Sequence, residues 1–570
     1  MGEQRVLTLL DSTGIQPYIF GSNRLRENIG ASELVARSTS SFVEQALQVA
    51  MGEQHDLSDL SKELPLEVED SRQAEVIYEG GGNVALLFRN LDKAKATVRE
   101  LSRLLLLYAP GLEVAAAHSE VFDWHTEKLA DSADGAPGRM TRLVEQLAYS
   151  KQRRAKSAPL AGLGVMLACR STGLPATCVY TDPDNNQLPV SAEIASKIGW
   201  RDVANGRLKQ QVLTDPRLQS YAIPEDFDDL GRSKGELSYL AVVHADGNGM
   251  GKRFQEVGKD KGNRDYITAI RELSHKVNEA GLQALRKVVE ELDAMLRKAE
   301  QETHDAEQFW EEERKDFQGG LPRSKAEEKA YLPFRPLVYG GDDVTFVCDG
   351  RLGLGLARRY LYEFEQATAS LPGGPAHACA GVAIIKTHYP FARAYELADE
   401  LCRSAKSFVR ERKEVSMDED ASAIDWHFAA SGRGASLNEI RKREYVAAND
   451  STLNMRPLLL HSGTNDQLRT WSVFEQAAWK LKYSDDWRER RNKVIALRET
   501  LRQGKDAVQQ FLIRYQIEKL PALAEGAEDA RTKGFVATHC LYFDAIEALE
   551  IFLPLEPVQP LEDKPKERSA

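Results

Sequence analysis

The tetrapeptide Gly340-Gly341-Asp342-Asp343 lies between two runs rich in β-forming residues, Pro336 to Tyr339 and Val344 to Cys348. This pattern predicts a β-hairpin whose turn is the tetrapeptide. The two glycines permit a tight turn with positive φ and leave room for a bulky ligand to approach the backbone. Aspartates supply the hard oxygen ligands that Mg²⁺ prefers together with substrate phosphates. Glycine and aspartate are also ordinary turn formers, so the tetrapeptide alone also fits a turn with no further role.

A second acidic turn stands upstream of this hairpin and reads Asp246-Gly247-Asn248-Gly249-Met250-Gly251-Lys252. It does not have the spacing of a phosphate-binding P-loop, because that pattern requires glycine where Asp246 stands and Ser or Thr where Arg253 stands. A strand is expected just before this turn, over residues 237–245. A long helix is expected after it, over about 265–300.

The elements around the two turns follow one another in a recognisable order. After the hairpin we expect a helix over about 352–371 and a strand over 377–385, which completes the βαββαβ order of a ferredoxin-like unit. In such a unit the first and third strands are antiparallel neighbours. We therefore expect Asp246 to lie beside Asp342 and Asp343, where two metal ions would assist an in-line attack on a phosphoryl group.

The N-terminal part of the chain repeats this pattern. Asp11 aligns with Asp246 and Gly14 with Gly249, and residues 76–86 parallel the later hairpin before an expected helix at 91–108 and strand at 112–117. The sequence thus predicts two such ferredoxin-like units in tandem, each of the kind called a palm in nucleotidyl-transferring proteins. Gly82 and Asn83 replace the two aspartates of the later turn, so we expect the first palm to hold Mg²⁺ poorly. It either binds a nucleotide through backbone amides and closes the site from the opposite side, or it is a structural duplicate.

Several stretches together resemble a known family: residues 14–20, the turn at 245–252, the Gly-Gly-Asp-Asp turn, and residues 380–386 leading into a helix at 392–406. Over residues 6–414 the sequence resembles the large, palm-bearing subunit of type III CRISPR effector complexes, which is related to GGDEF-type cyclases. The resemblance implies an enzyme that converts ATP into cyclic oligoadenylate when the complex senses foreign RNA.

The resemblance also implies roles for individual residues. Asp246, Asp342 and Asp343 would be the catalytic carboxylates that bind Mg²⁺ or Mn²⁺, with the Gly247 carbonyl as a further metal ligand. The residues implied in nucleotide binding are Gly247, Asn248, Gly249, Gly251, Gly340, Gly341, Arg403 and Lys406. Arg403, Lys406 and Arg410 share one helix face, which is either solvated or in contact with phosphate. Because Asn248 stands where the family often has an acidic residue, we expect the second metal to be held less firmly.

Two features common in the family are not expected here. Many relatives carry an N-terminal HD nuclease, whereas this sequence begins with the first palm. Its His-Asp pairs, His55-Asp56 and His304-Asp305, have no further histidines beside them. Relatives often have a cysteine-rich zinc element between the palms, but Cys169 and Cys178 cannot complete a four-ligand site. We therefore expect neither nuclease activity nor a structural zinc.

The length of 570 residues with 42% hydrophobic composition predicts several domains, each with a core. The fold class that we expect is α+β, with two tandem ferredoxin-like palms, an inserted linker domain and a C-terminal helical domain. The expected boundaries are 1–122 for the degenerate first palm, 123–235 for the linker domain, 236–415 for the catalytic palm, 416–553 for the helical domain and 554–570 for a disordered tail. Residues 302–328 are densely charged, which predicts an exposed excursion, either a lid or an inert loop.

Charge and cysteine content limit the partners and the compartment. The net charge of −12 argues against broad non-specific binding to nucleic acid. Six cysteines without a Cys-x-x-Cys pair indicate reduced thiols and a cytoplasmic protein. No apolar run is long enough to cross a membrane. In the C-terminal part, apolar residues at helical spacing such as Trp471, Phe474, Trp479 and Leu481 predict a bundle core or, as the alternative, a docking face.

The sequence therefore predicts a palm-type nucleotide cyclase that makes a cyclic oligonucleotide messenger in antiviral, CRISPR type III-like defence. Its expected partners are ATP or other nucleoside triphosphates, guide or target RNA, other CRISPR effector subunits and a second copy of the chain. Two alternatives stay open. One is a non-enzymatic scaffold subunit that binds RNA and protein. The other is a stand-alone dinucleotide cyclase. The sequence does not fix the base, the ring size or the linkage of the product.

Overall fold

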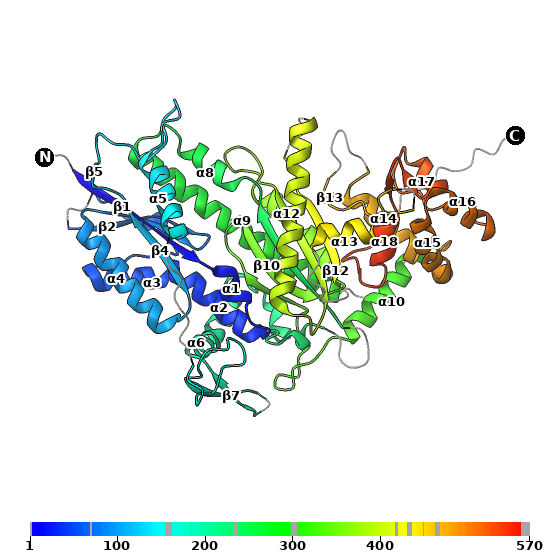
Figure 1. The fold of residues 1–570 in the computed structure, drawn as a ribbon, viewed down its shortest axis with the longest axis horizontal. Helices are drawn as coiled ribbons and strands as arrows, with labels where there is room; N and C mark the ends of the chain where they lie inside the picture. The colour runs from blue at the N-terminus through cyan, green and yellow to red at the C-terminus, as the bar shows by residue number, and fades with distance from the viewer. Residues whose placement is uncertain are drawn as a thin grey trace.

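The computed structural model describes residues 3–68, 71–153, 162–183, 185–231, 238–297, 305–416, 420–429, 436–448, 450–461 and 468–559. The chain is mixed α and β, with two larger sheets whose planes are covered by helices. The N-terminal sheet, the second sheet and the C-terminal helices follow one another along the long axis of the molecule, from blue through green and yellow to red (Figure 1).

The first sheet has the strand order β2-β3-β1-β4, with the short β5 paired to the start of β1. Its strands are β1 (Gln4–Thr13), β2 (Ala74–Gly80), β3 (Asn83–Phe88), β4 (Glu113–His118) and β5 (Phe122–Asp123). Its helices are α1 (Ile15–Phe20), α2 (Leu25–Thr39), α3 (Ser41–Met51) and α4 (Leu91–Tyr108). Strands β1 and β3 are antiparallel neighbours, and the helix predicted over 91–108 is present with those bounds.

The second sheet has six strands in the order β13-β12-β11-β8-β10-β9. Its strands are β8 (Tyr239–Gly247), β9 (Phe334–Val338), β10 (Asp343–Asp349), β11 (Ala378–Lys386), β12 (Ala423–Ala429) and β13 (Leu458–Leu459). Its helices are α8 (Met250–Gly258), α9 (Asn263–Arg297), α11 (Gly353–Ala367) and α12 (Phe391–Ser416). The order β11-β8-β10-β9 repeats the order β4-β1-β3-β2 of the first sheet.

The segment between the two sheets has two parts, which pack against different elements of the N-terminal half. Helix α5 (Arg139–Arg153), which lies after the expected boundary at 122, packs on β4 and β1 of the first sheet. The hairpin of β6 (Cys178–Thr181) and β7 (Gln187–Val190) adjoins α6 (Ala192–Gly199). Helices α6 and α7 (Arg201–Gln211) pack against α2. This later part is the candidate for a linker.

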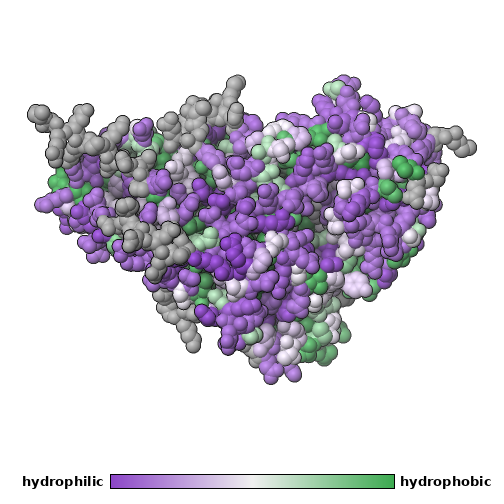
Figure 2. Space-filling model, turned by 180° about the vertical axis from the view of Figure 1, so that it is seen from behind, coloured by the Kyte–Doolittle hydropathy of each residue, from purple (hydrophilic) through white to green (hydrophobic). Residues whose placement is uncertain are grey.

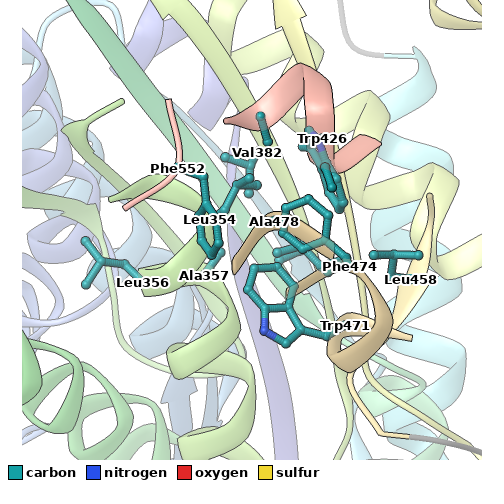
Figure 3. Packing of buried hydrophobic residues seen from close by; sticks show 14 of the residues in the cluster. Leu354, Leu356, Ala357, Val382, Trp426, Leu458, Trp471, Phe474, Ala478 and Phe552 are labelled. Atoms are coloured by element: carbon teal, nitrogen blue, oxygen red, sulfur yellow. The ribbon is translucent and has the colours of Figure 1, made fainter. Parts of the chain in front are cut away.

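The second palm and the C-terminal part share one hydrophobic core. The helices are α13 (Leu437–Glu444), α14 (Trp471–Tyr483), α15 (Arg491–Gln503), α16 (Lys505–Arg514), α17 (Glu528–Lys533) and α18 (Phe543–Ala548), with a small hairpin of β14 (Phe535–Val536) and β15 (His539–Cys540). Phe474 packs against Trp426 of β12 with ring centroids 4.8 Å apart (Figure 3). The aromatic residues at helical spacing are thus core residues, and the palm sheet continues past residue 415 through β12 and β13.

Two sequence predictions in this part of the molecule are wrong. Part of the expected exposed excursion forms helix α10 (Asp305–Gly319), which buries Trp310 and Phe317; residues 298–304 lie outside the described residues. The disordered tail was expected from 554, but the Trp310 indole donates a hydrogen bond to Pro554 O at 2.9 Å and Gln476 donates one to Gln559 O at 2.6 Å. Chain packing therefore continues to 559, and 560–570 lie outside the described residues.

The surface seen from behind is mainly hydrophilic, with separate hydrophobic patches (Figure 2). Across the described ranges, no helix is both long enough and apolar enough to span a bilayer.

Candidate active site

The two acidic turns meet at one end of the second sheet. Asp343, the first residue of β10, is the register partner of Asp246 on β8. The backbone N–H of Gly247 donates to Asp342 O at 3.1 Å, which ties the end of β8 to the turn. The predicted convergence of Asp246, Asp342 and Asp343 is therefore confirmed as geometry, and it follows from the antiparallel pairing of the first and third strands.

Glycine is required at the turn for two different physical reasons. Gly340 and Gly341 have φ values of 111° and 84°, a region that residues with a Cβ rarely adopt. At Gly247 the reason is crowding, since a Cβ there would lie 2.8 Å from the Asp342 Cβ. Gly249 has a φ of 63° and precedes helix α8, whose first turn exposes Gly251. These glycines bring the carboxylates close together around a bare backbone.

Burial shifts the pKa values of two of the three carboxylates upward. Burial, followed by the charge of Asp246, raises the pKa of Asp342 to about 6. Burial also raises the pKa of Asp343, which the His244 imidazole partly offsets. An acid whose pKa rises in this way is one whose ionised form lacks sufficient positive charge nearby. The site is thus suited to accept a cation.

Lys406 of α12 supplies the positive charge that the protein itself places here. Its Nζ lies 2.6 Å from Asp246 Oδ2 and 2.9 Å from Gly247 O. Burial lowers the pKa of Lys406, but the Asp246 carboxylate outweighs this effect and the net shift is upward. Lys406 therefore lies in the site, against an aspartate and a carbonyl oxygen; its contact with nucleotide phosphate stays a prediction.

Residues 239–415 match the family model for Cas10/Cmr2, second palm domain. This segment is similar to a Cas10/Cmr2 second palm domain. Among solved structures, the chain is similar to the Csm1–Csm4 cassette in complex with cA4 and to the same cassette in complex with pppApA. Each match has a TM-score of 0.50 and 12% identity, and covers 97% of this chain and 70% of the other. At an identity this low, the structural match shows a shared fold and nothing more. No curated protein sequence matches the chain.

Two residues implied in nucleotide binding point away from the carboxylates of the Cas10/Cmr2 palm. Arg403 is exposed and pairs with Asp399 at 2.7 Å on its own helix. Asn248 donates from its side chain to Ala421 O at 3.0 Å and to Asp420 at 3.3 Å, while its backbone N–H donates to His377 O. Asn248 thus fastens the turn to the segment just before β12, and its effect on a second metal stays a prediction.

The long helix α9 contacts both the Gly-Gly-Asp-Asp turn and strand β2 of the first sheet. Asn278 accepts a hydrogen bond from the Gly341 N–H at 3.1 Å, and a Cβ on Gly281 would lie 2.3 Å from Gly341 O. One turn earlier, the Ser274 hydroxyl donates to Glu79 O of the first palm at 3.0 Å. Sequence reasoning missed these residues; the spacing of four between Ser274 and Asn278 places them on one helix face, but only the fold shows what that face meets.

The first sheet repeats part of the same arrangement. Asp11 is the register partner of Asn83, as Asp246 is of Asp343. Asp11 forms an ion pair with Lys151 of α5, as Asp246 does with Lys406 of α12. Gly14, with a φ of 64°, precedes α1 as Gly249 precedes α8. Lys151 was not predicted, although it follows the fourth strand of its palm in a helix, as Lys406 does.

The donor set of the Cas10/Cmr2 palm fits a hard divalent cation. Three carboxylates and the Gly247 carbonyl meet at one turn, and the raised pKa of Asp342 marks a place where positive charge is favourable. Among the described residues, no group of three or more His, Cys, Asp or Glu side chains is arranged so that it could hold a metal ion by itself. Mg²⁺ does not need one, because it keeps water and substrate phosphates among its ligands.

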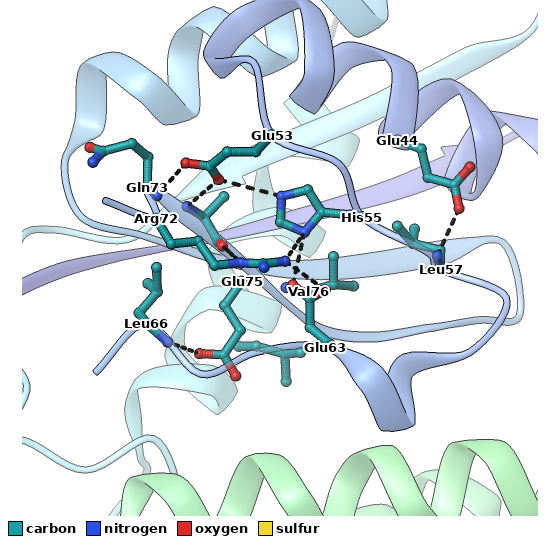
Figure 4. A network of polar contacts seen from close by, with 12 residues as sticks. Glu44, Glu53, His55, Leu57, Glu63, Leu66, Arg72, Gln73, Glu75 and Val76 are labelled. Atoms are coloured by element: carbon teal, nitrogen blue, oxygen red, sulfur yellow. Dashed lines mark hydrogen bonds and ion pairs between the residues drawn. The ribbon is translucent and has the colours of Figure 1, made fainter. Parts of the chain in front are cut away.

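Of the His55-Asp56 pair, His55 belongs to a separate, structural network, whereas Asp56 accepts hydrogen bonds from Ser58. His55 lies 2.8 Å from Glu63 and 2.9 Å from Arg72, and Glu63 also accepts from the Val76 N–H at 3.0 Å (Figure 4). These contacts fasten the segment before β2 to the edge of the first sheet. The other pair, His304-Asp305, includes a histidine outside the described residues.

Proposed function

We propose that the chain is a metal-dependent nucleotidyltransferase that joins ATP, or another nucleoside triphosphate, into a cyclic oligonucleotide. The observation that carries this proposal is the convergence of Asp246, Asp342 and Asp343 with Lys406 in a Cas10/Cmr2 second palm domain. The solved cassettes with the same fold, in complex with cA4 and with pppApA, support the class of product.

In the proposed reaction, a hydroxyl of one nucleotide attacks the α-phosphorus of another, the new phosphodiester bond forms and pyrophosphate leaves. Asp246, Asp342, Asp343 and the Gly247 carbonyl would hold Mg²⁺ or Mn²⁺ by their oxygens. The bound metal would lower the pKa of the attacking hydroxyl and offset the charge on the phosphates. Gly340 and Gly341 leave the backbone open to the triphosphate, and Lys406 would exchange part of its contact with Asp246 for the departing phosphates.

We propose further that both halves are ferredoxin-like palms and that the first holds the second nucleotide. Asp11, Lys151 and the loop at Gly14 preserve the frame of the site, while Asn83 removes one metal carboxylate. Holding two nucleotides in line removes much of the entropic barrier to their reaction. Helix α9, which contacts the Gly-Gly-Asp-Asp turn and strand β2, would keep the two palms in register.

We propose as partners other CRISPR effector subunits and guide or target RNA, with cyclic oligonucleotide signalling in antiviral defence as the role. The Csm1–Csm4 cassettes with the same fold pair a palm subunit with a second protein, which supports a role as a subunit. A scaffold without activity would share the fold but would not need the three carboxylates.

Product analysis by mass spectrometry tests the proposal. The purified chain is incubated with all four nucleoside triphosphates and Mg²⁺ or Mn²⁺, with and without RNA, beside the Asp342→Ala, Asp343→Ala double variant. A cyclic oligonucleotide that is absent from the double variant is expected. The same product from both proteins, or no product from the wild type under any of these conditions and in the assembled complex, would refute an enzyme at this site.

A further inference from the structure

His244 lies directly behind the carboxylates, two residues before Asp246 on β8 and therefore on the same face of the sheet. Its side chain is 6% exposed. The imidazole Nδ1 lies 3.1 Å from Thr345 Oγ1 and 3.4 Å from Asp343 Oδ1. An imidazole buried at this place contacts one of the candidate metal ligands without reaching the open side of the site.

Asp343 has one oxygen turned toward this histidine and one turned outward. The side chain as a whole is 49% exposed, yet Oδ1 is buried and has no hydrogen bond within standard geometry among the described residues. The imidazole Nδ1 at 3.4 Å is the polar group placed against it. Because Oδ1 faces the protein, Oδ2 is the oxygen left to face a ligand in the site.

The imidazole is itself held on its other sides. Asp399 of α12 lies 3.8 Å from Nε2, and Arg403 fixes Asp399 by an ion pair of 2.7 Å. The ring of Tyr395 packs edge-on against the imidazole with centroids 5.5 Å apart. A side chain restrained by charge, packing and the Thr345 hydroxyl can transmit a defined orientation to Asp343, because none of its neighbours lets it turn freely.

The first palm supplies an internal comparison. The register places Leu9 opposite Ala85 where the second palm has His244 opposite Thr345, and Asp11 opposite Asn83 where it has Asp246 opposite Asp343. Leu9 is buried like His244. The fold therefore accepts an apolar residue at this position, and in this chain the histidine and threonine occur in the palm that also has the carboxylate.

We propose that His244 is a positioning residue that orients Asp343 for metal binding: its ring holds Oδ1 and so directs Oδ2 toward the cation. The proposal rests on the proposed function, since it gives His244 a role only in a palm that binds a divalent metal. Polar groups that orient metal ligands in this way typically change metal affinity about 10- to 100-fold when removed.

The test measures Mn²⁺ binding to the nucleotide-free protein by electron paramagnetic resonance, together with kcat and KM for ATP. His244→Leu, the residue of the first palm, is expected to weaken Mn²⁺ binding about 10-fold with little change in Tm. His244→Asn should recover most of the affinity, because its amide nitrogen occupies nearly the position of Nδ1. In the Asp343→Ala background, His244→Leu should cause no additional loss.

Outcomes that overturn this role differ from those that overturn the proposed function. A folded His244→Leu protein with wild-type Mn²⁺ affinity, or a His244→Asn protein as weak as the leucine variant, refutes the positioning role while Asp343→Ala still weakens binding. Should His244→Leu not fold, His244→Phe provides the apolar variant. A wild-type protein that binds no Mn²⁺ at these carboxylates refutes both.

Discussion

The two larger sheets of this chain, which we propose to be two palms, share strand order, register and an aspartate–lysine pair, yet they differ in the residues that carry charge at the turn. Asp11 with Lys151 and Asp246 with Lys406 occupy matching places, and both palms start the following helix after a glycine with φ near 63°. This part of the arrangement belongs to the palm backbone and does not by itself define a metal site.

The difference lies in a few positions next to that shared frame. Where the second palm has Asp342 and Asp343, the first has Gly82 and Asn83, and where it has His244 and Thr345, the first has Leu9 and Ala85. The raised pKa of Asp342 indicates that its ionised carboxylate is unfavourable in the folded protein when no cation is bound. We infer that buried negative charge lowers the folding stability of the second palm only, where a bound metal would offset it.

The largest expected contrast is between the two lysines. Lys406→Met should lower kcat about 100-fold, since a positive charge aimed at the reacting phosphates is removed while the length of the side chain is kept. Lys151→Met should change KM for ATP less than 10-fold and leave kcat nearly unchanged. Steady-state rates of cyclic product formation measure both. Equal losses of kcat in the two variants would contradict the functional difference between the palms.

A second contrast concerns the stability of the metal-free protein. The folded-state pKa of Asp342 is raised from 3.8 to about 6, so its ionisation opposes folding at pH values above about 6. Asp342→Asn should therefore raise the free energy of unfolding by about 1 to 2 kcal/mol at pH 7, allowing for partial solvent screening. The gain should shrink as the pH falls from about 6 and vanish below 3.8.

An aspartate of the first sheet, the counterpart of Asp246, provides the control and should not show this gain. Asp11→Asn removes the partner of Lys151, so it should leave stability unchanged or lower it by less than about 1 kcal/mol. Urea unfolding in the presence of a chelator gives both values. Adding Mg²⁺ should then favour the wild type over Asp342→Asn, because binding to the folded state alone stabilises it. A stabilising effect of Asp11→Asn equal to that of Asp342→Asn would remove the asymmetry.

The sequence predicts the site correctly where its residues are brought together by neighbouring strands of one βαββαβ unit. Two acidic turns in βαββαβ order predict from sequence alone that Asp246 lies beside Asp343, because antiparallel pairing leaves few registers for a hairpin. The lysine at 406 was found through the resemblance alone. Its partner, Asp246, is 160 residues away, so only the packing of α12 on the sheet shows the contact.

The misses have a common physical cause, which is contact between segments remote in sequence. In the sequence of α10, Trp310 and Phe317 stand among many acidic and basic residues, so the segment looks exposed. In the structure these two side chains are buried and anchor the helix. Strand β12 joins the sheet in parallel to β11 after the long helix α12, a pairing that no local turn signals. In the sequence, His244 is a single polar residue in an apolar strand, and only the strand register shows that it lies opposite Thr345.

The smallest expected contrast is along α9, whose Asn278 and Ser274 contact the Gly-Gly-Asp-Asp turn and strand β2 of the first sheet. Asn278→Ala removes the acceptor for the Gly341 N–H, so the turn that carries the aspartates loses one restraint and kcat should fall about 3- to 10-fold, in line with about 1 kcal/mol for one hydrogen bond. Ser274→Ala removes an equivalent bond from β2, next to a turn without carboxylates, and its effect on kcat should be less than about 2-fold. Both variants should keep the wild-type Tm within about 2 °C, because each bond lies at a partly exposed position. A loss of kcat in Ser274→Ala as large as that in Asn278→Ala would mean that α9 acts by holding the two palms together, and that the geometry of the Gly-Gly-Asp-Asp turn does not depend on its own contact with the helix.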